Sequence, residues 1–143
     1  MYLKYCTLRN RLFNINTQRY WNKIWAKEQI NLNPYRFYPP AFTEIIKIIP
    51  YESKVADIGC GIGILLERLR KERACQVFGV DISQEAILAL KRKDIDGIVA
   101  KVPPIPLPTE SFDIVTATEL LEHVNNPYSV IKEMIRIVKS GGY

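Results

Sequence analysis

The residues whose types and spacing are most suggestive of chemistry lie at positions 55–63, where the sequence reads VADIGCGIG. A short apolar run ends at Asp57, and three glycines follow at every second position. Glycines are used in this way where the backbone turns tightly or a ligand approaches it closely. A second carboxylate, Asp81, ends another apolar run 20 residues after Gly61. Because one carboxylate can accept hydrogen bonds from both hydroxyls of a ribose, this pairing predicts a site for a cofactor that contains adenosine.

The loop departs from the dinucleotide-binding pattern G-x-G-x-x-G. Gly59 and Gly61 fit its first two positions, but the third position holds Ile64, and the third glycine, Gly63, comes one residue early. Asp57 lies directly before the loop, where a carboxylate would repel a pyrophosphate and would suit a cationic ligand. The loop therefore favours a cationic methyl donor over NAD(P). An NAD(P)-dependent oxidoreductase stays open as an alternative, because Asp81 suits the adenosine of either cofactor.

Apolar patterns predict the elements that position these residues. Strands are expected at 54–59, 76–82, 97–102 and 112–118, and helices at 17–30, 41–49, 64–73 and 84–93. A last helix is expected to start at the cap Asn126 and to stop at Gly141–Gly142. Its predicted apolar stripe consists of Val130, Ile131, Met134, Ile135 and Val138. Such alternation predicts an α/β fold with a mostly parallel sheet and helices on both faces. Ligands bind such sheets beyond the carboxyl ends of the strands, where Asp57 and Asp81 are expected.

Four segments carry a family resemblance: VADIGCGIG, GVDIS, LPTESFDIV and ELLEHV. In this order and spacing they resemble class I S-adenosylmethionine-dependent methyltransferases, in particular the branch described as methyltransferase type 11. The resemblance runs from about Ser53 to Tyr143. It implies a Rossmann-like fold with strand order 3-2-1-4, S-adenosyl-L-methionine as the cofactor, and methyl transfer to an acceptor, with a small molecule as the expected class. In the family further strands follow the segment that reads VKSGGY here, so the fold is expected to lack its C-terminal strands.

The resemblance also implies a set of cofactor-binding residues. They are Asp57, Ile58, Gly59, Cys60, Gly61 and Gly63 around the methionine and ribose, Asp81 at the ribose hydroxyls, Ile82 beside the adenine, and Ala117 and Thr118 on the floor of the site. One position departs from the family. The acidic residue that usually follows the third strand and binds the adenine amine is replaced by Lys101, or by Ala100.

Three further residues, Glu119, Glu122 and His123, are the candidates for catalysis. Quinone-biosynthesis O-methyltransferases and small-RNA 2′-O-methyltransferases use a similar triplet to hold a magnesium-type ion, which would assist deprotonation of a hydroxyl. The other interpretation is that the segment is a common helix opening, with solvated acids and a structural histidine. Both interpretations, a magnesium site and no metal site, stay open.

Residues 1–39 differ in composition from residues 40–143. They hold seven Lys or Arg, one acidic residue and nine of the 15 aromatic residues. We therefore predict a basic, aromatic N-terminal helical arm or lid at 1–39 and a cofactor-binding core at 40–143. Trp21 and Trp25 could stack on RNA bases with the basic side chains on phosphates, or they could pack on the sheet or cover the cofactor.

The remaining features bound the class of protein. Cys6, Cys60 and Cys75 are odd in number and scattered, which argues against a disulfide framework and predicts a reducing, cytoplasmic setting. We expect no signal peptide and no membrane span. The fourth strand would form an apolar edge through which an oligomer could pair. A non-catalytic, shortened cofactor-binding remnant that needs a partner or a continuation is the alternative to an active enzyme.

Overall fold

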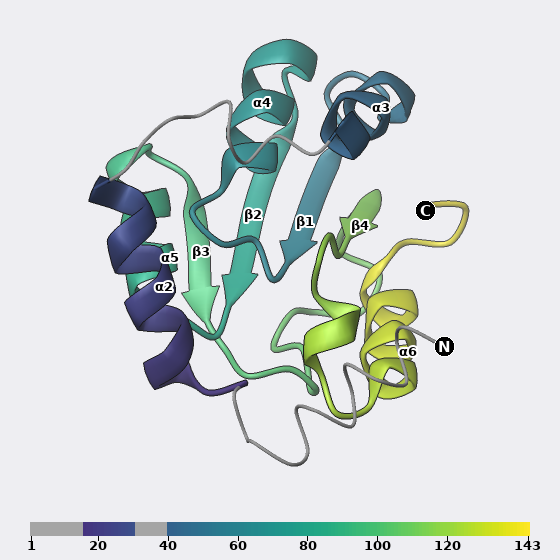
Figure 1. Ribbon diagram of the computed structural model, residues 1–143. Coiled ribbons are helices and arrows are strands. Elements are labelled where there is room, and N and C mark those ends of the chain that lie inside the picture. The colour runs from purple at the N-terminus through teal and green to yellow at the C-terminus, as the bar shows by residue number, and fades with distance from the viewer. Residues whose placement is uncertain (1–15, 31–39) are drawn as a thin grey trace.

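The computed structural model describes residues 16–30 and 40–143. The predicted boundary between arm and core, near residue 39, and most of the predicted arm lie outside these ranges. The elements, in chain order, are α2 (Gln18–Ile30), α3 (Pro40–Ile48), β1 (Lys54–Ile58), α4 (Ile64–Arg73), β2 (Gln76–Asp81), α5 (Gln84–Arg92), β3 (Asp96–Val99), β4 (Ile114–Thr116), the 3-10 turn η2 (Leu121–His123) and α6 (Pro127–Ile137) (Figure 1). None of the helices in the described ranges is long and apolar enough to cross a membrane.

The strands form one parallel sheet in the predicted order, β3-β2-β1-β4. In the register of β1 and β2, Asp57 is opposite Gly79, and Ile58 is opposite Val80. Parallel strands end at the same edge of a sheet, so the residues after β1 and β2 meet there. The fold thereby brings the loop after Asp57 next to Asp81, as the sequence predicted.

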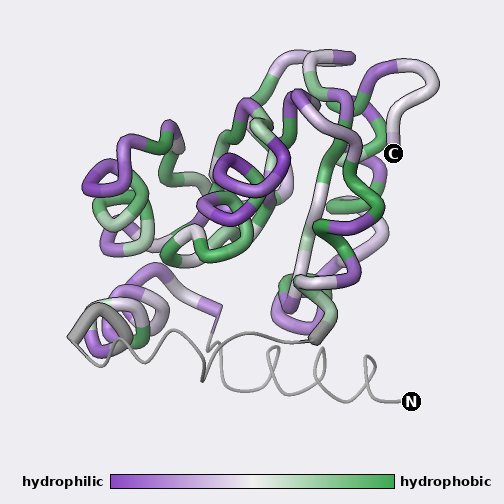
Figure 2. Tube along the Cα trace, turned by 90° about the horizontal axis from the view of Figure 1, so that it is seen from above, coloured by the Kyte–Doolittle hydropathy of each residue, from purple (hydrophilic) through white to green (hydrophobic). Residues whose placement is uncertain are grey.

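Helices cover both faces of the sheet, because successive side chains of each strand point to opposite faces. Val55 faces a core cluster with α3 and α4, whereas Ala56 and Ile58 face a second cluster with α6 and the segment 100–112. A third cluster fills the space between α4 and α5. Figure 2 shows that apolar residues concentrate between these layers, while hydrophilic residues lie mainly on the outer helix surfaces. The predicted layered α/β architecture is confirmed.

Polar caps fix where the helices start. The Thr17 hydroxyl accepts a hydrogen bond from the Tyr20 N–H at 3.2 Å, Ser83 accepts one from the Ala86 N–H, and Asn126 accepts one from the Ser129 N–H. Each cap satisfies a backbone donor that has no partner within its own helix. Of the three, the Asn126 cap was predicted from the sequence.

The prediction for the last helix was wrong in two respects. α6 ends at Ile137 rather than near Gly141, because Val138 leaves the helix to form a parallel bridge with Phe112. Only part of the predicted stripe faces inward: Val130 is fully buried and Met134 packs on the core together with Ile137, whereas Ile135 is 66% exposed and Ile131 is 39% exposed. The helix is therefore rotated so that positions 130 and 137, two turns apart, pack on the sheet.

In the part of the chain that the structure describes, β4 lies at one edge of the sheet, and Tyr143 lies along its outer side. The Tyr143 N–H donates to the Asp113 carbonyl, and the Tyr143 carbonyl accepts from the Val115 N–H. This is the hydrogen-bond pattern of a parallel neighbour. The backbone at Tyr143 therefore satisfies part of the edge that β4 would otherwise expose.

Candidate cofactor-binding site

The glycine loop is tied to the end of β2 by its own backbone. Gly59, Gly61 and Gly63 all have left-handed backbone angles, with φ of 78°, 52° and 74°. These turns direct the N–H groups of Gly59 and Cys60 to the Val80 carbonyl, at 2.7 and 3.1 Å. The Gly61 N–H donates to Asp81 Oδ2 at 2.9 Å. The loop and Asp81 thus form one hydrogen-bonded unit at the carboxyl edge of the sheet.

Asp57 is a buried carboxyl group beneath this loop. It is only 1% exposed, and its Oδ1 accepts a hydrogen bond from the Thr116 hydroxyl at 2.7 Å. Burial raises the pKa of Asp57 from 3.8 to about 7; the Thr116 bond opposes this rise, and the nearby Asp81 adds to it. Without a cation beside it, Asp57 is therefore partly protonated near neutral pH. A cation that binds beside it would draw the carboxyl into its charged form.

Asp81 is also buried, but both of its oxygens have partners. Its Oδ1 accepts from the Ser83 N–H at 2.8 Å, and its Oδ2 accepts from Gly61. Burial raises the pKa of Asp81, and the backbone bonds lower it. A carboxylate has about four lone-pair sites, so each oxygen retains room for one further donor. The backbone bonds hold the carboxylate in the orientation in which a ribose could use it.

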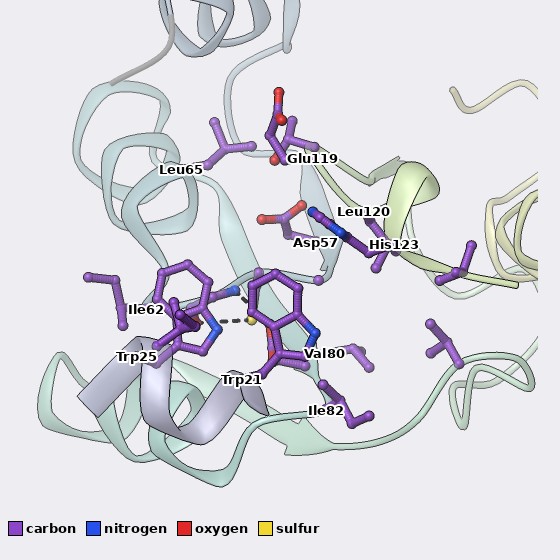
Figure 3. A pocket seen from close by; sticks show the side chains of 18 of the residues that line it. Trp21, Trp25, Asp57, Ile62, Leu65, Val80, Ile82, Glu119, Leu120 and His123 are labelled. Atoms are coloured by element: carbon purple, nitrogen blue, oxygen red, sulfur yellow. Dashed lines mark hydrogen bonds between the residues drawn. The ribbon is translucent and has the colours of Figure 1, made fainter. Parts of the chain in front are cut away.

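A cavity of about 580 Å³ lies over these groups (Figure 3), a size that suits a small-molecule cofactor. The predicted site residues that line it are Asp57, Gly59, Cys60, Gly61, Asp81, Ile82, Thr118, Glu119 and His123. Ala100 and Lys101, where the sequence lacks the adenine-binding acid, also line it. The structure therefore brings most of the predicted residues together around one cavity.

Four predicted residues do not line the cavity: Ile58, Gly63, Ala117 and Glu122. Ile58 and Ala117 pack in the core on the α6 side of the sheet, because their neighbours Asp57 and Thr118 take the side facing the cavity. Gly63 serves the fold, since a Cβ built there would collide with the Leu90 side chain of α5. Gly63 thus permits close packing of α4 and α5.

The Cys60 side chain is buried, and burial raises the pKa of its thiol. A thiol of raised pKa is a poor nucleophile, so Cys60 is better explained as a small side chain in the loop than as a catalytic nucleophile. Cys60 and Cys75 are both unpaired. Cys6 lies outside the described residues.

Helix α2 forms one wall of the cavity. A Cβ on Gly61 would lie 2.7 Å from the Trp25 ring, so the indole rests directly on the glycine loop. Trp21 stacks near Trp25, with ring centroids 6.2 Å apart, and meets the His123 ring edge-on at 5.0 Å (Figure 3). Among the two interpretations of the tryptophans, the structure favours packing over the cofactor cavity.

An asparagine anchors this wall to the next helix. Asn22 Oδ1 accepts hydrogen bonds from the Ser83 hydroxyl at 2.7 Å and from the Gln84 N–H at 2.9 Å. Ser83 in turn donates its N–H to Asp81. Sequence reasoning missed Asn22, and it missed Thr116 beneath Asp57, because no local pattern links residues about 60 positions apart.

The magnesium interpretation of Glu119, Glu122 and His123 gains no support. Within residues 16–30 and 40–143, no group of three or more His, Cys, Asp or Glu side chains is arranged to hold a metal ion. A hydrogen bond from Glu122, together with its charge, raises the pKa of Glu119. The Glu119 and Glu122 carboxyls therefore lie close to each other, while the His123 ring packs against Trp21. Leu121–His123 form a short 3-10 turn rather than the opening of a longer helix.

The sheet order, the glycine loop after β1 and the carboxylate after β2 define a Rossmann-like fold of the class I methyltransferase type. The chain belongs to the Methyltransferase domain family, whose model matches residues 56–143. This membership decides against the NAD(P)-dependent oxidoreductase that the glycine loop had left open.

Several named proteins are similar in sequence to part of this chain. The ubiquinone biosynthesis O-methyltransferase of Nitrosomonas europaea is 39% identical over 99 residues, which are 64% of this chain and 42% of that protein. The same enzyme from Stutzerimonas stutzeri is 43% identical over 98 residues, 62% of this chain and 41% of that protein. The chain thus spans about two fifths of the length of these relatives.

The fold is also found in solved structures. The Haloferax volcanii complex between the Trm112 methyltransferase activator and a protein described as a methyltransferase superimposes with a TM-score of 0.76 at 23% identity, covering 85% of this chain and 57% of that one. Haemonchus contortus phosphoethanolamine N-methyltransferase 2, solved with S-adenosyl-L-methionine, gives 0.62 at 24% identity, covering 69% and 25%.

Proposed function

We propose that this chain binds S-adenosyl-L-methionine in the cavity over the glycine loop and supplies the cofactor-binding part of a methyltransferase. The observation that carries the proposal is the pair of buried carboxyls, Asp57 and Asp81, on either side of a loop that donates one of its amides to Asp81. Such a site suits a ligand with hydroxyls at one end and a positive charge at the other. S-adenosyl-L-methionine has both features.

The proposed roles follow the geometry. Asp81 takes the ribose hydroxyls, Ile82 packs beside the adenine, and Asp57 faces the cationic end. Gly59 and Gly61 supply the left-handed turns that tie the loop amides to Val80 and Asp81. Ala100 and Lys101 border the adenine side, and since a lysine cannot accept a bond from the adenine amine, a backbone carbonyl has to do so.

The bound cofactor would supply an activated methyl group on a sulfonium, so this chain's residues would act chiefly by positioning. Trp21, Leu120 and His123 line the part of the cavity formed by α2 and η2, and we assign the methyl acceptor to this side. A base is needed only if the acceptor must lose a proton. Glu119 and His123, which both line the cavity, are then the candidates.

We propose a small molecule that carries a hydroxyl as the acceptor. The apolar and aromatic wall supports this class, and the named relatives are O-methyltransferases of ubiquinone biosynthesis. A protein partner is a second proposal for the β4 side, because Tyr128 and Ile135 of α6 are 79% and 66% exposed near that edge. A structural neighbour is complexed with an activator protein. RNA binding through the basic N-terminal arm at 1–39 stays a prediction.

A thermal-shift comparison tests the cofactor proposal. S-adenosylhomocysteine, the demethylated product of the cofactor, should raise the melting temperature of the chain, because a ligand that binds only the folded state stabilises it. NAD and NADP at the same concentrations should leave the melting temperature unchanged. A shift with either nicotinamide dinucleotide and none with S-adenosylhomocysteine would overturn the proposal. Binding without methyl transfer to any offered hydroxyl acceptor would favour the non-catalytic alternative.

A further inference from the structure

The indole nitrogen of Trp25 is a buried hydrogen-bond donor without an acceptor. Among the described residues it is the one buried side-chain polar atom for which the structure has no partner. Buried donors are nearly always satisfied in folded proteins, and tryptophan N–H groups usually find a partner when they are buried. Trp25 lines the cofactor cavity while its nitrogen is covered, so a ligand that shifts the ring slightly on binding would provide the missing acceptor.

The neighbouring tryptophan gives a contrast within the same helix. Trp21 stacks near Trp25 and lines the same cavity, but its Nε1 donates to Asn16 Oδ1 at 2.9 Å. One indole is thus satisfied by the protein and the other is not. The difference is one of hydrogen bonding, since both rings belong to the same wall (Figure 3).

The charges around the cavity indicate which ligand group Trp25 would meet. Three carboxyl-bearing residues line it, Asp57, Asp81 and Glu119, and the lysine that lines it, Lys101, is assigned to the adenine side. An anionic group at the methionine end of the ligand is repelled by the three acids and is placed best against a wall without acids. The cavity-lining residues of α2 are Trp21, Ile24 and Trp25, none of them acidic.

The helix next to Trp25 favours the same placement. Ile64 and Leu65, the first residues of α4, line the cavity, and no side chain caps this helix start. The first N–H groups of a helix and its dipole attract negative charge. Trp25 rests on Gly61, three residues before α4 begins. An anion beside Trp25 would therefore have a favourable field as well as a donor.

We propose that the Trp25 Nε1–H donates a hydrogen bond to the carboxylate of the methionine moiety of S-adenosyl-L-methionine. The inference rests on the proposed function. It assigns the two ends of the amino-acid moiety to opposite sides of the cavity, with the ammonium toward Asp57 and the carboxylate toward α2. Trp25 would then select for cofactors and products that carry a free carboxylate.

Calorimetric titration with two ligands tests this assignment. S-adenosyl-L-methionine and its decarboxylated analogue differ in the carboxylate that Trp25 is proposed to bind. Trp25→Phe removes the N–H and keeps an aromatic ring, and it should weaken S-adenosyl-L-methionine on the order of tenfold, as expected for a hydrogen bond to a charged group. The analogue should bind wild type and variant within about twofold of each other. Trp21→Phe is the control, because the Trp21 N–H of the wild type already donates to Asn16. This change should not alter the ratio of the two affinities.

A second variant separates the hydrogen bond from ring packing. Replacing Trp25 by 3-benzothienylalanine retains the bicyclic ring and substitutes sulfur for the N–H, and it should give the same selective loss as Trp25→Phe. Equal losses for both ligands, or no loss for either, would overturn the inference while leaving the cofactor proposal intact. Wild-type protein that binds neither ligand would overturn both.

Discussion

The Gly61 N–H donates a hydrogen bond to Asp81 Oδ2 at 2.9 Å, although the two residues are 20 positions apart. This bond joins the glycine loop to the end of the neighbouring strand. It means that the carboxylate proposed for the ribose also orients the loop proposed for the methionine. The two halves of the cofactor site are therefore one structural unit, and changes at one half should be felt at the other.

Asp57 should make the stability of the protein depend on pH when no cofactor is added. Its pKa is raised from 3.8 to about 7 in the folded chain. Its contribution to the free energy of unfolding is therefore fully present below pH 4 and is lost as the pH rises through 7. The unfolding free energy of the wild type relative to Asp57→Asn should fall by about 2–3 kcal/mol between pH 5 and pH 8. Urea unfolding of both proteins at the two pH values measures this difference. A difference that does not change with pH would contradict the raised pKa of the Asp57 carboxyl.

The same carboxyl should couple cofactor binding to proton release. If Asp57 must ionise to face a cation, the affinity for S-adenosyl-L-methionine should rise about tenfold from pH 6 to pH 8, following the ionised fraction of a group whose pKa is about 7. Calorimetry in two buffers of different ionisation enthalpy would show the released proton. Asp57→Asn should remove the contribution of this group. A rise of equal size in that variant would assign the proton to another residue, with Asp81 the first to examine.

Gly63 should be intolerant of a side chain for a structural reason. Gly63→Ala combines a left-handed φ of 74° with a collision against Leu90. Gly141→Ala is the matched control, because Gly141 has a φ of 80° and nothing within 4 Å of an added Cβ. The control should cost about 1–2 kcal/mol from backbone strain alone, and Gly63→Ala should cost about 1–3 kcal/mol more from overpacking. Equal losses in denaturant unfolding would show that α4 and α5 yield to the added methyl.

Asn22 should hold α2 against the start of α5. Asn22→Ala removes the acceptor for Ser83 and Gln84 and should weaken this docking by about 1 kcal/mol. Hydrogen exchange of the α2 amides should become faster, while the amides of β1 and β2 keep their protection. Asn22→Asp retains an acceptor oxygen and adds a charge that suits a helix N-terminus, so it should restore the protection. Unchanged exchange in Asn22→Ala would mean that the tryptophans alone hold the helix.

Local patterns were sufficient for the central part of the fold. β1, α4, β2 and α5 were predicted to within about one residue, since each combines a periodic apolar pattern with a clear cap or turn. Asp57 and Asp81 could be placed at the same sheet edge because parallel strands end together. Ile58 could have been excluded from the site by the same logic, since side chains alternate along a strand and its neighbour Asp57 faces the cavity.

The rest depended on contacts between distant segments. The side of α6 that packs inward could not be read from its apolar residues, because Ile131 and Ile135 continue the pattern on the exposed side. The Thr116 bond to Asp57 and the Asn22 bond to Ser83 each join residues about 60 positions apart. The triplet Glu119, Glu122 and His123 looked like one site in the sequence. In the structure the Glu119 and Glu122 carboxyls lie close to each other, while the His123 ring packs against Trp21.

The proposed cofactor site is tested most directly by calorimetric titration of S-adenosylhomocysteine into wild type, Asp81→Ala and Asp113→Ala. Asp113 is the control, since it also accepts a backbone bond, from the Lys54 N–H, but lies outside the cofactor cavity. We expect Asp81→Ala to bind at least about tenfold more weakly than wild type, because a charge-assisted bond to a ribose hydroxyl is worth about 1.5–3 kcal/mol, while Asp113→Ala binds as wild type does. Indistinguishable binding by all three proteins would contradict the role assigned to Asp81 and, with it, the proposed cofactor site.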